Sequence, residues 1–252
     1  MPASVAPSDS STGAKPRHYF ATTHWSVVLS AGRSDTTSAH LALESLCRTY
    51  WYPLYAYARR RGYSAHDAED MTQAFFAHLL DRKSVANADP NKGRFRSFIL
   101  GAMTHYLANE SVKLRAQKRG AGKEVLSLDA AAAEERFDLE PATGRSPDET
   151  FDKEWATALL NKVLNALEED FRRQNKSELF AALKQTLAGS RADQPYAMLA
   201  KQLEMNEGAV KTAVHRLRKR YRQLLEAEIA NTVASPAEIK EELAYLLKIM
   251  AS

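Results

Sequence analysis

Basic side chains between Lys201 and Arg222 have the chemistry needed to bind nucleic acid. Seven Lys or Arg residues lie in this stretch against two acids, Glu204 and Glu207, which gives a net charge of +5. Lys and Arg attract phosphate, and an Arg fork can also recognise a guanine edge. The stretch is therefore either a DNA-binding surface or a basic face that is merely solvated, as is common on surface helices.

Apolar spacing places these charges on the second of two helices within 195–225. Leu199, Ala200 and Leu203 give the first helix an apolar edge. The second helix has apolar residues at spacings of three and four: Val210, Ala213, Val214, Leu217, Tyr221 and Leu224. Pro195 suits a first helical turn and Asn206 is a good N-cap. This is the helix-turn-helix plan, in which the second helix enters the major groove.

The predicted turn has one unfavourable residue. Many such turns carry Gly where this chain has Glu204. A left-handed backbone there would cost Glu about 1 kcal/mol relative to Gly.

A second basic segment covers 92–119 and is mixed with aromatic residues. It holds seven Lys or Arg residues and one acid, Glu110, a net charge of +6. Such a mixture suits a surface that follows phosphates and stacks bases. Phe98 and Tyr106 fit the apolar helical pattern and are expected in the core, whereas the position of Phe95 is left open.

A third segment, 64–80, combines an apolar stripe with an acidic face. Ser64 is the expected N-cap of this helix, with Asp67 three residues later. Off the stripe lie Asp67, Glu69, Asp70 and Gln73. The charges alone favour neither of two interpretations, a solvated surface or a docking face for a basic partner.

Composition fits a protein of two compact domains in a reducing compartment. The chain has 252 residues, 44% hydrophobic and 26% charged, with a net charge of +4. Its one cysteine, Cys47, excludes an intrachain disulfide and is expected to be a buried thiol. No apolar run is long enough to span a membrane, and the polar N-terminus lacks a signal-peptide core. We therefore expect a cytoplasmic protein.

The hydrophobic periodicity is helical throughout and predicts an all-α fold of two helical domains joined by a flexible linker. Helices are expected at about 37–61, 151–171 and 177–187, and a terminal helix after Ser235 is expected to pack back on the second domain. The predicted divisions are a disordered tail at 1–17, a first domain at 18–119, a linker at 120–150, a second domain at 151–228 and a helical extension at 229–252.

Three stretches, taken in order, carry a family pattern. They are HDAEDMTQAFFAHLL at 66–80, GRFRSFILGAMTHYLANE at 93–110, and the 195–225 motif with EGAVKTAVHRLRKRYR. Together they resemble the extracytoplasmic-function (ECF) sigma factors of bacteria, with sigma domain two at about 37–119 and domain four at about 151–225. The turn residue Glu204, the long stretch 168–194 and both terminal extensions depart from the minimal family pattern.

The resemblance implies a non-catalytic initiation factor that binds core RNA polymerase, recognises the minus-ten and minus-thirty-five promoter elements and helps to open the duplex. The implied polymerase contacts, to the β′ clamp, are Asp67, Glu69, Asp70 and Gln73. The implied minus-ten contacts are Lys92, Arg94, Phe95, Arg96, His105, Asn109, Lys113, Arg115, Lys118 and Arg119. The implied minus-thirty-five contacts are Lys211, Thr212, His215, Arg216, Arg218, Lys219 and Arg222. The polymerase β flap is a further implied partner; an anti-sigma factor is common in the family, although no residue here identifies one.

Two other classes of protein remain as alternatives. A stand-alone helix-turn-helix regulator would bind duplex DNA tightly without polymerase. An enzyme is disfavoured because the seven histidines are scattered, with no metal-ligand spacing, phosphate loop or nucleophile elbow. No cofactor or metal is expected.

Overall fold

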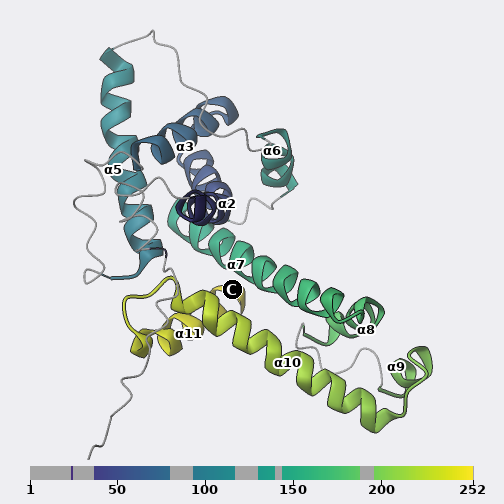
Figure 1. Ribbon diagram of the computed structural model, residues 1–252. Coiled ribbons are helices and arrows are strands. Elements are labelled where there is room, and N and C mark those ends of the chain that lie inside the picture. The colour runs from purple at the N-terminus through teal and green to yellow at the C-terminus, as the bar shows by residue number, and fades with distance from the viewer. Residues whose placement is uncertain are drawn as a thin grey trace, which may run out of the picture.

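The computed structural model describes residue 24 and residues 37–79, 93–116, 130–139, 144–187 and 196–251, with the side chains of 37–43, 111–116 and 130–131 excepted. All regular structure in these residues is helical, as predicted (Figure 1). None of the described helices is long and apolar enough to cross a membrane.

The first three helices build an aromatic-rich core. α2 (Thr37–Arg60) continues through Pro53 and is followed by α3 (Ala65–Leu79) and α5 (Phe95–Ala116). Gly62, with φ of 93°, turns the chain between α2 and α3, in a region of backbone space that glycine adopts readily. Cys47 is buried in this core as predicted, and burial raises the pKa of its thiol to about 12.

The stretch predicted as a linker contains regular structure. α6 (Ala130–Leu139) lies within it, and its Glu134 accepts hydrogen bonds from Tyr55 and Arg59 of α2. α7 (Pro147–Arg173) begins four residues before the expected start at 151. The reason is a capping box, in which Ser146 and Glu149 satisfy each other's backbone N–H groups.

Two long helices, α7 and α10 (Glu207–Ala230), run side by side (Figure 1). Each contributes buried residues to two hydrophobic cores. The first half of α7 buries Phe151, Trp155 and Leu159 against α2. Its second half packs with α8 (Ser177–Leu183), η2 (Lys184–Leu187) and α9 (Tyr196–Gln202) in a second core that contains Leu167. Apolar packing therefore continues from the first three helices into α7. The division predicted from the sequence instead places the first three helices and α7 on opposite sides of a linker.

The C-terminal helix is part of this packing. After η3 (Pro236–Glu238), α11 (Ile239–Ala251) lies against both α7 and α10. Ile229, Val233 and Leu246 of the C-terminal segment are buried in the first core. The terminal helix was expected to pack back on the second domain; it packs on α7 and α10, and its buried Leu246 belongs to the first core.

Candidate nucleic-acid interface

The helix-turn-helix predicted at 195–225 is present. α9 ends at Gln202 and α10 begins at Glu207, where the Asn206 side chain accepts a 2.8 Å hydrogen bond from the Ala209 amide, as expected for an N-cap. The backbone of Glu204 is left-handed, with φ of 53°. The turn thus has the conformation that the sequence predicted to be costly for Glu. Pro195 lies outside the described residues.

Replacing Glu204 by glycine is expected to stabilise the protein. Glycine adopts a left-handed backbone without a Cβ clash, which is worth about 1 kcal/mol, less the entropy it gains when unfolded. We expect a gain of about 0.5 kcal/mol in the free energy of unfolding, measured by urea denaturation. The matched control is Glu207→Gly, which places glycine in the first turn of α10 and should destabilise. A Glu204→Gly protein less stable than wild type would contradict this account of the turn.

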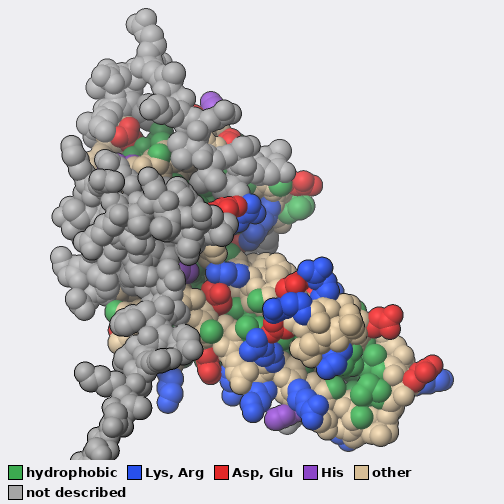
Figure 2. Space-filling view, in the orientation of Figure 1, with side chains coloured by type: hydrophobic (Ala, Val, Ile, Leu, Met, Phe, Trp, Pro, Cys, Tyr) green, Lys and Arg blue, Asp and Glu red, His purple; other side chains and the backbone are tan. Residues whose placement is uncertain are grey.

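One face of α10 is buried and the other is exposed and basic. Val210, Val214 and Leu217 lie in the second core. All seven predicted minus-thirty-five residues are exposed: Lys211, Thr212, His215, Arg216, Arg218, Lys219 and Arg222. Figure 2 shows Lys and Arg side chains gathered over this part of the molecule.

Two arginines of α10 contact neighbouring elements and hold the helix in place. Arg218 donates two hydrogen bonds, of 3.1 and 2.7 Å, to the Thr186 carbonyl in η2. Arg220 pairs with Asp170 of α7, with Nε 2.8 Å from Oδ2, and this hydrogen bond lowers the pKa of the Asp170 carboxyl. Arg218 is therefore tied to the protein backbone although its side chain is exposed, and Arg216, two residues earlier in α10, is exposed as well.

The acidic face of α3 is where the sequence placed it. Ala68, Thr72, Phe75, Phe76 and Leu79 are buried. Asp67 and Asp70 are exposed, and Glu69 and Gln73 are half-buried. Ser64 caps the helix through the Asp67 amide, and Gln73 donates a 3.0 Å hydrogen bond to Glu69. All four side chains thus share the solvent side of α3.

The first turn of α5 differs from the expectation of a DNA-facing surface. Phe95 is fully buried and packs edge-on against His24 and Tyr50. Arg96 is only 8% exposed. In this conformation neither side chain can reach DNA. Phe95 is buried in the core, and acidic side chains of the protein itself pair with Arg96.

The acids around Arg96 come from distant parts of the chain. Arg96 donates a 2.7 Å hydrogen bond from Nε to Glu242 of α11 and a 2.9 Å hydrogen bond from Nη1 to Asp152 of α7. Its guanidinium lies 4.0 Å from the centre of the Tyr245 ring, a cation–π contact. No local spacing in the sequence indicates this cluster, since its members are separated by 56 and 146 residues.

Of the remaining minus-ten candidates Arg94 is half-buried, and the others divide into three groups. His105 and Asn109 are exposed on α5. Lys113 and Arg115 belong to α5 with side chains that are not described, and Lys92, Lys118 and Arg119 lie outside the described residues. The exposed part of the candidate surface that can be described is therefore the middle of α5.

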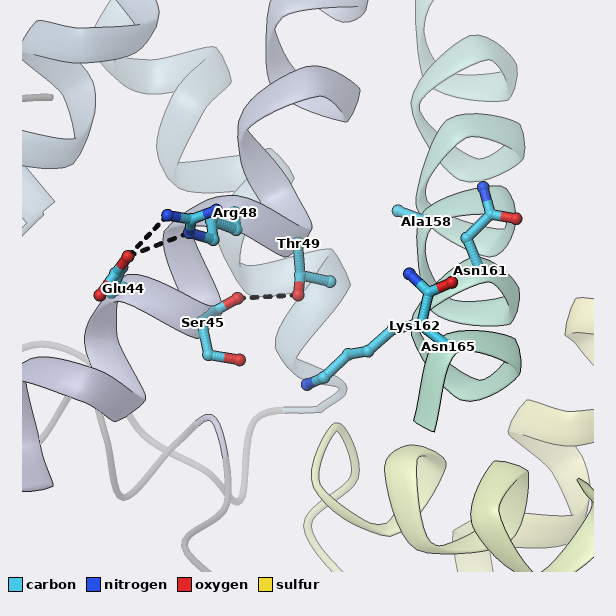
Figure 3. Close-up of a pocket in the computed structure, with 8 residues that line it drawn as sticks. All are labelled: Glu44, Ser45, Arg48, Thr49, Ala158, Asn161, Lys162 and Asn165. Atoms are coloured by element: carbon cyan, nitrogen blue, oxygen red, sulfur yellow. Dashed lines mark hydrogen bonds and ion pairs between the residues drawn. The ribbon is translucent and has the colours of Figure 1, made fainter. Parts of the chain in front are cut away.

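A polar groove lies between α2 and α7, with a volume of about 540 Å³ (Figure 3). Its charged side chains already have partners. Arg48 lies 2.8 Å from Glu44, and Lys162 lies 2.9 Å from Glu228 of α10. Within the described residues, no group of His, Cys, Asp and Glu could hold a metal ion.

Part of the chain matches a known protein family. Residues 46–119 match the family model of sigma-70 region 2, a span that contains most of α2 together with α3 and α5. The match covers less than a third of the chain, and it shows that this stretch is similar to sigma-70 region 2. Comparisons with curated proteins and with solved structures gave no significant match.

Proposed function

We propose that this protein is a bacterial sigma factor of the ECF type, which binds core RNA polymerase in the cytoplasm and directs it to promoters. The observation that carries the proposal is the sigma-70 region 2 match over 46–119, which contains the exposed acidic face of α3. Sigma factors supply promoter recognition, whereas the polymerase supplies the catalytic chemistry.

In this proposal α3 docks on the β′ clamp through Asp67, Glu69, Asp70 and Gln73. Their position on the solvent side of the helix, with Asp67 and Asp70 exposed and Glu69 and Gln73 half-buried, supports this role. The middle of α5, with His105 and Asn109, would lie along the non-template strand of the minus-ten element. Exposed side chains on a basic segment are suited to contact unpaired bases and phosphates.

The basic face of α10 is proposed to recognise the minus-thirty-five element. Near its N-terminus Glu207, Gly208, Lys211 and Thr212 are small or polar and exposed, as a helix entering the major groove requires. Lys211, Thr212, His215 and Arg216 would face the bases, and Arg218, Lys219 and Arg222 would lie nearer the phosphates. Through the same module the protein would contact the β flap.

Gel filtration with bacterial core RNA polymerase, followed by transcription from a genomic library, tests the proposal. We expect co-elution and new, discrete start sites that share two sequence elements. No complex with polymerase, together with tight and specific duplex binding by the free protein, would instead establish a stand-alone regulator.

Charge reversal at Asp70 is expected to weaken polymerase binding. Asp70→Lys places a cation where the docking model needs an anion, and an exposed ion pair is worth up to about 1 kcal/mol. We expect about a fivefold increase in Kd for core polymerase, measured by fluorescence anisotropy at low salt. Asp138→Lys makes the same charge change on an exposed residue of α6 and serves as the control. Equal affinities for the two variants would remove α3 from the interface.

Replacing Arg216 by alanine is expected to reduce promoter selectivity. A bidentate contact from Arg to guanine contributes about 1–3 kcal/mol of discrimination. The measurement compares transcription from a cognate promoter with transcription from a promoter altered at one minus-thirty-five position. For Arg216→Ala the ratio of the two should be lower than for wild type. Lys219→Ala is the contrasting variant, because loss of a phosphate contact should weaken all promoters alike. If Arg216→Ala transcribes every promoter like wild type, the recognition face has been assigned to the wrong side of α10.

A further inference from the structure

The beginning of α5 is held by acidic side chains from α11 and α7. Arg94 lies 3.2 Å from Glu241 and 3.0 Å from Glu242, and Arg96 lies 2.7 Å from Glu242 and 2.9 Å from Asp152. We call these two arginines and three acids the α5–α11 clasp. Tyr245 of α11 completes it, with its ring over Arg96 and its hydroxyl donating to Asp152.

Backbone contacts fix the same end of the helix. The Phe95 amide donates a 2.9 Å hydrogen bond to the carbonyl of Thr232, in the segment that joins α10 to η3. The first turn of α5 has no acid of its own. Every described carboxylate at this end of α5 therefore comes from another helix, chiefly from the C-terminal extension.

We propose that α11 is an autoinhibitory element, which must release Arg94 and Arg96 before they can bind the non-template strand. This inference rests on the proposed function, because it concerns the regulation of the proposed minus-ten surface. The clasp occupies the same guanidinium donors that a phosphate would need.

The charge of the clasp opposes DNA as well. Three carboxylates against two guanidinium groups leave a net charge of −1 at a place where the sequence alone suggests two positive charges. A phosphate backbone that approaches this end of α5 meets Glu241, whose side chain is 72% exposed. The clasp thus removes two possible arginine–phosphate contacts and adds repulsion between its carboxylates and the phosphate backbone.

The structure also suggests the order of release. Arg94 is the more accessible arginine, with 25% of its side chain exposed against 9% for Arg96. Glu242 Oε2 is buried and, although Arg94 Nε lies 3.0 Å away, no donor is aligned for a hydrogen bond to it. Arg94 would exchange its carboxylates for phosphate first, and Arg96 would follow when α11 moves.

Binding of single-stranded DNA by the full-length protein tests the clasp without polymerase. The probe is a fluorescein-labelled oligonucleotide of about 20 nucleotides and mixed sequence, titrated at several salt concentrations. The variant Glu241→Gln/Glu242→Gln keeps side-chain size and removes two negative charges. The control Glu135→Gln/Asp138→Asn makes the same charge change on exposed residues of α6.

We expect the clasp variant to bind about fivefold more tightly than the control. The salt dependence of its affinity should also be steeper, by about 0.7 in the logarithmic slope for each further phosphate that the released arginines neutralise. Equal affinity and equal slope in two folded proteins would overturn the proposal.

A second measurement on the wild-type protein covers the case in which the variant fails to fold. Hydrogen exchange is followed over 239–251 in the free protein and in its complex with core polymerase and promoter DNA. Faster exchange in the complex is expected, and unchanged or slower exchange overturns the proposal. If no complex with polymerase forms, the proposed function fails, and the oligonucleotide titration still decides whether the clasp restrains Arg94 and Arg96.

Discussion

Replacement of Glu242 by alanine is expected to lower the free energy of unfolding by about 3–5 kcal/mol, the range for breaking one side of a buried ion pair. Glu242 is fully buried and lies between Arg94 and Arg96. Without it, Asp152 is the one acidic partner that Arg96 keeps among the described residues, and Arg96 remains buried. The cost is therefore mostly that of an uncompensated buried charge.

Urea denaturation of Glu242→Ala beside Glu241→Ala measures this effect. Glu241 is exposed, so its loss should change stability by less than about 1 kcal/mol. The double variant Arg96→Met/Glu242→Leu should recover much of the loss, because apolar side chains of similar volume can replace a buried ion pair. If Glu242→Ala were as stable as Glu241→Ala, α11 would not be held by this cluster.

Local patterns predicted the helices that carry the proposed interfaces. The division of α10 into a buried and a basic face follows from spacings of three and four, and the structure has the same division. The acidic face of α3 follows from the same rule. Cap residues and a left-handed turn at Glu204 were also predictable, because backbone hydrogen bonding near a helix end depends on residues close in sequence.

Long-range contacts could not be predicted in this way. Arg94 and Arg96 have the spacing of a DNA-binding segment, and only the packing of α11 shows that carboxylates already occupy them. The burial of Phe95 depends on His24 and Tyr50, which precede it by 71 and 45 residues. Composition suggested a linker at 120–150 because acids and Ala dominate there, yet Glu134 anchors α6 to Arg59 of α2.

The stability of the protein is expected to fall in mild acid because of His24. Its backbone N–H donates a 2.9 Å hydrogen bond to Asn231, and its ring is buried between Tyr50 and Phe95. Burial, and to a lesser degree the nearby charge of Lys162, lowers the pKa of His24 from 6.5 to about 3. A folded-state pKa below the unfolded value means that the unfolded chain takes up a proton first as the pH drops.

The effect of His24 is absent above about pH 7, where the imidazole is neutral in both states, and grows as the pH falls from 6.5 towards 3. At about pH 4.5, two units below the ordinary pKa, it amounts to about 3 kcal/mol. Urea denaturation of His24→Phe isolates it, because phenylalanine keeps an aromatic ring and cannot titrate. The stability of wild type should decline more steeply in acid than that of His24→Phe, whereas His105→Gln, at an exposed site on α5, should follow wild type. Parallel profiles for wild type and His24→Phe would mean that His24 is protonated in the folded protein, and so that solvent reaches the contact of His24 with Tyr50 and Phe95.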